Sequence, residues 1–129
     1  MAIPAQSLSG TEVLRRECID AQSTDYTAFR FDTLHPVTGT ETYTVPALHI
    51  ITIISIIFTE TAGNAEGLHL QGFLSNQTIK LLNDQTLAAK DTFVWSDKLV
   101  LIGGDKLVAG TTAGANIDIW YTYIDQSWE

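Results

Sequence analysis

Three histidines are the residues of this sequence best suited to metal binding. His35, His49 and His69 lack the four-residue spacing that places two imidazoles on one face of a helix, and no pair of cysteines accompanies them. His49 and His69 flank an expected hairpin, so they could approach one another across strands. The spacing favours ordinary strand histidines, and we expect no metal site.

Cys18 is the only cysteine, so the chain cannot form an internal disulfide. A nucleophilic thiol needs a base close by, and the sequence around Cys18 carries no signature of one. We therefore expect Cys18 to be a small buried apolar side chain.

The acidic residues and glycines also lack a catalytic spacing. Six aspartates occur at or near expected turns, where Asp bonds to local backbone: Asp25, Asp32, Asp84, Asp91, Asp97 and Asp105. They do not follow the spacing of a calcium loop, and nothing pairs two of them for glycoside hydrolysis. Gly103-Gly104-Asp105-Lys106 is too short for a phosphate loop and is typical of a hairpin turn. The sequence thus predicts a protein that is not an enzyme, with no catalytic residue and no cofactor.

The net charge of the chain limits the kinds of partner that it can bind. The chain has 129 residues and a net charge of −8, with 15 acidic and 7 Lys or Arg residues. A nucleic-acid binder needs clustered bases, and the one adjacent pair, Arg15-Arg16, is surrounded by acids. The same charge disfavours an anionic membrane surface. We expect neither nucleic acid nor membrane as a partner, and the polar start of the chain predicts no secretion signal.

The most apolar segment is the isoleucine-rich run 50–58. Its nine residues are too few for a membrane helix, which takes about 20. Six of them are Ile, a β-branched type that favours strands. We expect a central strand that is buried on both faces.

Short strands separated by turn residues fill the rest of the chain. Residues 11–21 suit a strand better than a short helix, and residues 117–124 alternate apolar and polar side chains. The other expected strands are 26–31, 41–45, 68–74, 78–82, 92–95, 98–102 and 106–109, with hairpin turns at 62–65 and 103–105. This spacing predicts an all-β fold, an antiparallel β-sandwich or a jelly-roll-like barrel of about 8–10 strands. Residues 11–129 form one domain, preceded by a flexible arm, 1–10.

Two tryptophans and the arm are the candidate interface. Trp120 is expected on the side of the last strand opposite its Ile and Tyr residues, and Trp128 lies beside the C-terminus. Outer aromatic side chains indicate a protein interface or a platform for sugars, with ordinary packing as the alternative. Ile3 and Pro4 belong to the arm, which is small and polar enough to become ordered only on a partner.

Four segments together resemble small β-sandwich virion proteins of tailed bacteriophages. They are Tyr43-Thr44-Val45-Pro46-Ala47 before the Ile run, Asn64-Ala65, Ala88–Val94, and Leu99–Leu107. The resemblance covers about residues 41–124. It implies a non-enzymatic protein of the capsid decoration or cement type, or of the neck and tail accessory type.

The same resemblance implies partners and a location. We expect a homo-oligomer, with a trimer as the expected state, that binds the major capsid protein or another virion protein. It would be made in the host cytoplasm and located in the virion. Two alternatives stay open: a tail or receptor-binding module that contacts host glycan, and a small β-sandwich enzyme with an unrecognised site.

Overall fold

The computed structural model describes residues 11–22, 24, 26–31, 43–112 and 116–128, and these residues form two antiparallel sheets without a helix. The all-β prediction is confirmed. The expected arm, 1–10, lies outside the described residues. The strands are β1 (Thr11–Gln22), β2 (Thr27–Ala28), β3 (His49–Glu60), β4 (Glu66–Leu74), β5 (Gln77–Leu87), β6 (Thr92–Trp95), β7 (Leu99–Ile102), β8 (Lys106–Thr111) and β9 (Ile117–Ser127).

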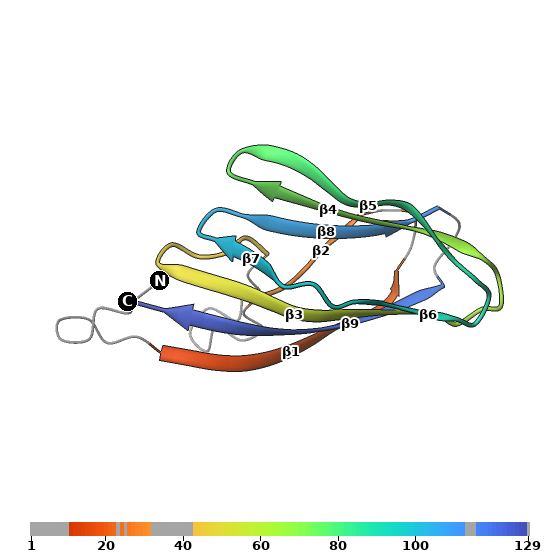
Figure 1. Ribbon diagram of the computed structural model, residues 1–129, viewed down its shortest axis with the longest axis horizontal. Coiled ribbons are helices and arrows are strands. Elements are labelled where there is room, and N and C mark those ends of the chain that lie inside the picture. Colours follow the sequence, from red (N-terminus) through yellow and green to blue (C-terminus); the bar gives the residue numbers. More distant parts are fainter. Residues whose placement is uncertain (1–10, 23, 25, 32–42, 113–115, 129) are drawn as a thin grey trace.

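The two sheets lie one over the other, as Figure 1 shows. The first has the order β1-β9-β3-β6, and β7 also pairs with β3. Because β6 pairs with Ile56–Thr59 and β7 with Ile50–Ile53, these two strands form one interrupted edge. The second sheet has the order β2-β8-β4-β5. Counting β6 and β7 as one strand leaves four positions in each sheet, the arrangement of a jelly roll.

Alternating side chains build the core between the sheets. On β9, Ile117, Ile119, Tyr121 and Tyr123 are buried, as the sequence predicted. They meet inward side chains of β3 and the second sheet, which include Ile51, Ile53, Ile56, Phe58, Leu68, Leu70 and Leu107. A two-residue period on facing sheets therefore accounts for the core.

The isoleucine-rich strand is central but is buried on one face only. β3 lies between β9 and the interrupted edge, which confirms its central position. Its burial alternates, however, and the prediction of burial on both faces is wrong. Ile50 and Ile57 lie on the outer face, where no third layer of the described chain covers the sheet.

Both predicted turns exist, but neither forms the predicted hairpin. The loop 61–65 carries the chain from β3 in the first sheet to β4 in the second. The turn at Gly103-Gly104, with Gly104 at φ 93°, connects β7 to β8 and also changes sheets. The turn chemistry was predicted correctly, but the strands on either side pair with other partners.

Several strand boundaries also differ from the prediction, and of the expected strand 26–31 only Thr27–Ala28 is a strand. β5 continues through Asn83-Asp84-Gln85, where a turn was expected, because Asp84 takes φ 61° as the extra residue of a β-bulge. Of the expected strand 41–45, the described part contributes only an isolated bridge between Thr44 and Lys106. The described residues contain no helix with the length and hydropathy that a membrane span requires.

Candidate interaction surfaces

The fold separates the histidines that the sequence offered as candidate metal ligands. His49 on β3 bonds through Nδ1 to Oδ1 of Asp125 at 2.8 Å. His69 lies in the other sheet, where its Nδ1 accepts the backbone N–H of Asp84 at 3.3 Å. The two do not approach one another, and His35 lies outside the described residues. No group of three or more His, Cys, Asp and Glu in the described part of the chain is arranged to hold a metal ion.

Cys18 is exposed, so the prediction of a buried thiol is wrong. It lies on the edge strand β1, opposite Trp120 of β9. Its neighbours Glu17 and Ile19 pair with the inward residues Tyr121 and Ile119, which leaves Cys18 on the outer face.

A buried tyrosine joins the two sheets. The Tyr121 hydroxyl accepts the backbone N–H of Arg30 at 2.7 Å and donates to the Arg30 carbonyl at 2.8 Å. Arg30 follows β2, so one hydroxyl fixes the crossing chain against β9. Burial is the main cause that raises the pKa of Tyr121 well above its usual range.

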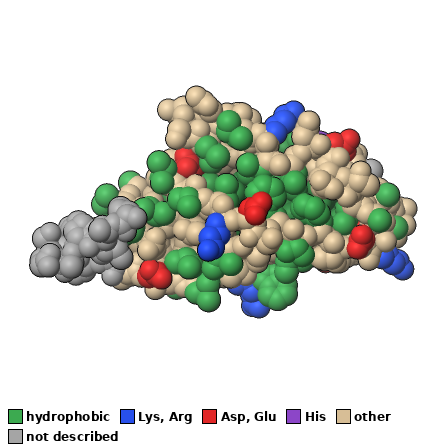
Figure 2. All heavy atoms as spheres, in the orientation of Figure 1, with side chains coloured by type: hydrophobic (Ala, Val, Ile, Leu, Met, Phe, Trp, Pro, Cys, Tyr) green, Lys and Arg blue, Asp and Glu red, His purple; other side chains and the backbone are tan. Residues whose placement is uncertain are grey.

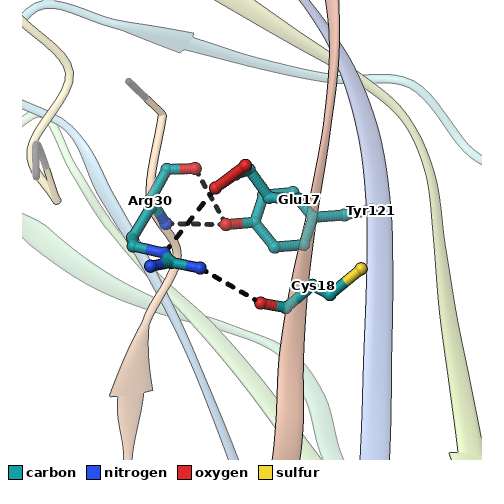
Figure 3. A network of polar contacts seen from close by, with 4 residues as sticks. All are labelled: Glu17, Cys18, Arg30 and Tyr121. Carbon is teal, nitrogen blue, oxygen red and sulfur yellow. Dashed lines mark hydrogen bonds and ion pairs between the residues drawn. The ribbon is translucent and has the colours of Figure 1, made fainter. Parts of the chain in front are cut away.

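The Arg30 side chain completes this network, which is drawn in Figure 3. Its Nε lies 3.6 Å from Glu17 Oε2, and its guanidinium donates to the Cys18 carbonyl at 3.4 Å. The Cys18 thiol points away from the network. These contacts attach the residues after β2 to the edge strand β1, which is a structural role.

Glu60 holds two loops together at the end of β3. Its carboxylate accepts the backbone N–H groups of Ala62, Gly63 and Asn64 in the next loop, and of Lys90 in the loop before β6, at 2.6 to 3.1 Å. Burial acts to raise the pKa of this carboxyl, but the four donors together outweigh burial and hold the pKa below its usual value. A carboxylate occupied in this way is a loop anchor.

The outer face of the first sheet, in contrast, carries many apolar side chains. The register places five rows of side chains across it, and two of them, Arg16–Thr122–Ser55 and Asp118–Thr59–Thr92, are polar. The other three are Glu12–Gln126–Ile50–Ile102, Leu14–Ile124–Thr52–Val100, and Cys18–Trp120–Ile57–Val94. We call the twelve residues of these three rows the apolar face. In Figure 2, hydrophobic side chains gather along the band that β3, β7 and β9 occupy, with scattered charged groups among them.

Several large side chains of the apolar face are strongly exposed. Leu14 is 67% exposed, Val100 56% and Val94 51%. Arg16 lies over the ring of Trp120, 5.4 Å from its centroid. A half-polar outer face is usual for an antiparallel sheet, so this concentration of Val, Leu, Ile and Trp is the surface feature that needs an explanation.

The structure places one predicted interface residue on the apolar face. Trp120 is 46% exposed there. Trp128 is half-buried beyond the end of β9, and its backbone N–H donates to Leu48 at 3.1 Å. Ile3 and Pro4 lie outside the described residues. Sequence reasoning missed Leu14, Val94, Val100 and Ile102. The unbroken apolar run Leu99–Ile102 on a short strand was a signal for Val100 and Ile102.

Comparison with known proteins shows the fold. No family model matches this chain, and no curated protein does. A solved structure of disulfide-linked pili, the Bacillus endospore appendages, matches with 13% identity and a TM-score of 0.51, covering 100% of this chain and 98% of that one. The virus-like particle of extra small virus, from the giant freshwater prawn Macrobrachium rosenbergii, matches with 12% identity and a TM-score of 0.50, covering 100% and 86%. This chain has a jelly-roll-like β-sandwich fold.

The comparisons do not single out proteins of tailed bacteriophages. A capsid structure of the Helicobacter pylori bacteriophage KHP30 matches with 10% identity and a TM-score of 0.44, covering 92% of each chain. That score is too low to carry an argument. The two better matches are a pilus protein and a virus-particle protein, both structural components of assemblies.

Proposed function

We propose that this protein is a non-enzymatic structural subunit of a virus particle, of the capsid decoration or cement type, that assembles through the apolar face. The single observation that carries the proposal is the exposure of Leu14, Val94, Val100, Ile102 and Trp120 on one sheet face. Removing such side chains from water contributes about 25 cal/mol per Å² of apolar surface. The occupant we propose is a second copy of the chain, in an oligomer that then binds the capsid.

The edges of the same sheet favour contact through the face and disfavour extension of the sheet. β1 is a long edge strand that pairs with another strand, β9, along one side only. It carries Glu12, Arg15, Arg16, Glu17 and Asp20. Charged side chains on an edge oppose the addition of another strand. Copies of the chain are therefore expected to meet through the apolar face and not edge to edge.

The chemistry of the described residues supports a structural role. Buried polar side chains such as Glu60 and Tyr121 are occupied by backbone groups, and the resemblance described above implies a virion protein. Two solved structures with a comparable fold come from a pilus and a virus-like particle. In a particle, many identical copies combine weak contacts into stable attachment.

Sedimentation of the purified protein tests the assembly step. We expect the natural protein to sediment as an oligomer, with a trimer as the expected state, and Val100→Lys to sediment as a monomer with unchanged circular dichroism. Thr78→Lys places the same charge on an exposed position of the other sheet and is the matched control. A monomeric natural protein, or a Val100→Lys variant that still assembles, would refute this use of the apolar face.

Binding to undecorated capsids tests the proposed place in the virion. The natural protein should bind at a copy number that matches the capsid lattice, and Val100→Lys should bind more weakly. Deletion of residues 1–10 should weaken attachment without lowering the melting temperature, because we propose that the arm with Ile3 and Pro4 contacts the neighbouring subunit. Equal binding by all three proteins would contradict the proposal.

A further inference from the structure

The outer face of the second sheet differs from the apolar face in its chemistry. Its register places three rows of side chains across β8, β4 and β5: Lys106–Phe73–Thr78, Val108–Gln71–Lys80, and Gly110–His69–Asn83. Two of the seven basic residues of the chain lie in these rows, and no Asp or Glu does. Asp84, the extra residue of the β5 bulge, has its side chain over Gly67, beyond the third row.

Two aromatic rings border a hollow on this face. Tyr26, 47% exposed, lies against Gly110, where an added Cβ would come within 3.0 Å of the ring. It also stacks on His69, with centroids 6.1 Å apart and planes at 26°. At the other end, Phe73 is 37% exposed and has the Lys106 ammonium 5.8 Å from its centroid. The absence of a side chain at Gly110 therefore lets the Tyr26 ring lie this close to β8.

The hollow between the rings has a volume of about 400 Å³, within the range of small-molecule sites. Its lining consists of Tyr26, Ala28, Gln71, Phe73, Lys106 and Val108. Gln71 offers both a donor and an acceptor, and Lys106 offers a cation. His69 accepts a backbone N–H through Nδ1, so its neutral ring carries the proton on Nε2 and adds a donor beside Tyr26.

We propose that this groove binds an acidic pyranose, a sugar unit that carries a carboxylate. The apolar C–H face of a pyranose packs on an aromatic ring, and its hydroxyl groups match the amide of Gln71. A carboxylate matches Lys106 and the neighbouring Lys80, which lies directly across from Gln71. The proposal does not depend on the assembly function, because it uses the opposite face of the sandwich.

The charge of the chain favours an acidic sugar over a nucleic acid. Single strands also stack on aromatic side chains, but their binding requires neutralisation of many phosphates. Two lysines on a protein with a net charge of −8 do not provide that. The proposed ligand is a single acidic pyranose unit, and Lys80 and Lys106 are sufficient to pair with its one carboxylate.

Titration of the full chain with three matched probes tests the site. The probes are trigalacturonate, the neutral galactotriose, and a three-nucleotide oligothymidylate. We expect trigalacturonate to bind with a dissociation constant of about 1 mM or below. Amide NMR shifts should change at Tyr26, Gln71, Phe73 and Lys106 and stay constant on the apolar face. Galactotriose should bind about tenfold more weakly, because it makes no contact with the lysines.

Variants separate the aromatic contribution from the charged one. Phe73→Ala should weaken binding of both sugars about tenfold, while Phe73→Tyr should retain it. The double variant Lys80→Gln/Lys106→Gln should remove the preference for the acidic sugar and leave galactotriose binding unchanged. Lys98→Gln removes a lysine from the exposed turn before β7, outside both surfaces; it is the control and should bind as the natural protein does.

Four results of these titrations would contradict the proposed sugar site. The proposal is overturned if trigalacturonate causes no saturable shift, if the shifts fall on the apolar face, or if Phe73→Ala binds normally. Tighter binding of the oligothymidylate would also overturn it, in favour of a single-stranded nucleic acid. Because sedimentation measures assembly separately, failure here is distinguishable from failure of the structural role.

Discussion

Tyr121 and Tyr123, two inward-facing tyrosines of β9, provide a matched test of the polar network in Figure 3. Tyr121→Phe removes a hydroxyl that makes two hydrogen bonds to the backbone of Arg30, at 2.7 and 2.8 Å. The ring remains, together with its contact with Phe29, whose centroid lies 4.4 Å away. Tyr123→Phe removes a buried hydroxyl that has no hydrogen-bond partner among the described residues. The same chemical change is therefore expected to have opposite effects at the two positions.

The expected magnitudes follow from the cost of unpaired polar groups. Without the Tyr121 hydroxyl, the Arg30 N–H and C=O each lose a partner, at about 1 kcal/mol apiece, so the free energy of unfolding should fall by about 2 kcal/mol. Removal of the unsatisfied Tyr123 hydroxyl should leave stability unchanged or raise it by about 1 kcal/mol. For a chain of this length, Tyr121→Phe should lower the melting temperature by about 8 °C.

Urea unfolding followed by circular dichroism measures both variants. The dependence of the unfolding free energy on urea should be the same for all three proteins, which makes the midpoints comparable. If the two variants lose equal stability, or if Tyr123→Phe loses more, the hydroxyl bonds of Tyr121 do not fix the chain after β2, and the reasoning from the network is wrong.

Three further predictions test the core and the titrating groups. Ile53→Asp should unfold the domain, because an unpaired charge at a fully buried position costs several kcal/mol, out of a total free energy of unfolding of about 5–15 kcal/mol. Val100→Asp on the apolar face is the control and should stay folded. A folded Ile53→Asp protein would contradict the assignment of the core. Since the folded pKa of Glu60 lies below the ordinary 4.5, its stabilising contribution is complete above that pH and is lost as the pH falls further. Glu60→Gln should therefore lower the melting temperature near neutral pH, and the difference should narrow in acid; a constant difference would show that the carboxylate charge is not what holds the loops. Burial raises the pKa values of Tyr121 and Tyr123 above the ordinary 10, so their contribution is complete below pH 10 and is lost at higher pH. Absorbance of tyrosinate should rise together with the loss of circular dichroism in alkali, and complete ionisation of all tyrosines in a folded protein would refute this.

Much of the local structure of the chain follows from its amino-acid sequence alone. Alternation along residues 117–124 placed Tyr121 and Tyr123 inward and Trp120 outward, and both are observed. The β-branched residues of 50–58 specified a strand, and the Gly103-Gly104 pair specified a turn. These features depend on the preferences of single residues and their near neighbours, which a sequence displays directly.

Which strands are neighbours depends on the packing of the whole chain. A turn fixes a few dihedral angles, but the burial of apolar faces decides whether the chain stays in one sheet or crosses to the other. For that reason the turns at 61–65 and 103–104 connect the two sheets, although their residues suit hairpins equally well. The pairing of distant strands in turn created both candidate surfaces. It brought Leu14, Trp120 and Val100 onto one face from three parts of the chain, and it placed Tyr26 against Gly110, a contact between residues 84 positions apart (110 − 26) that no local pattern encodes.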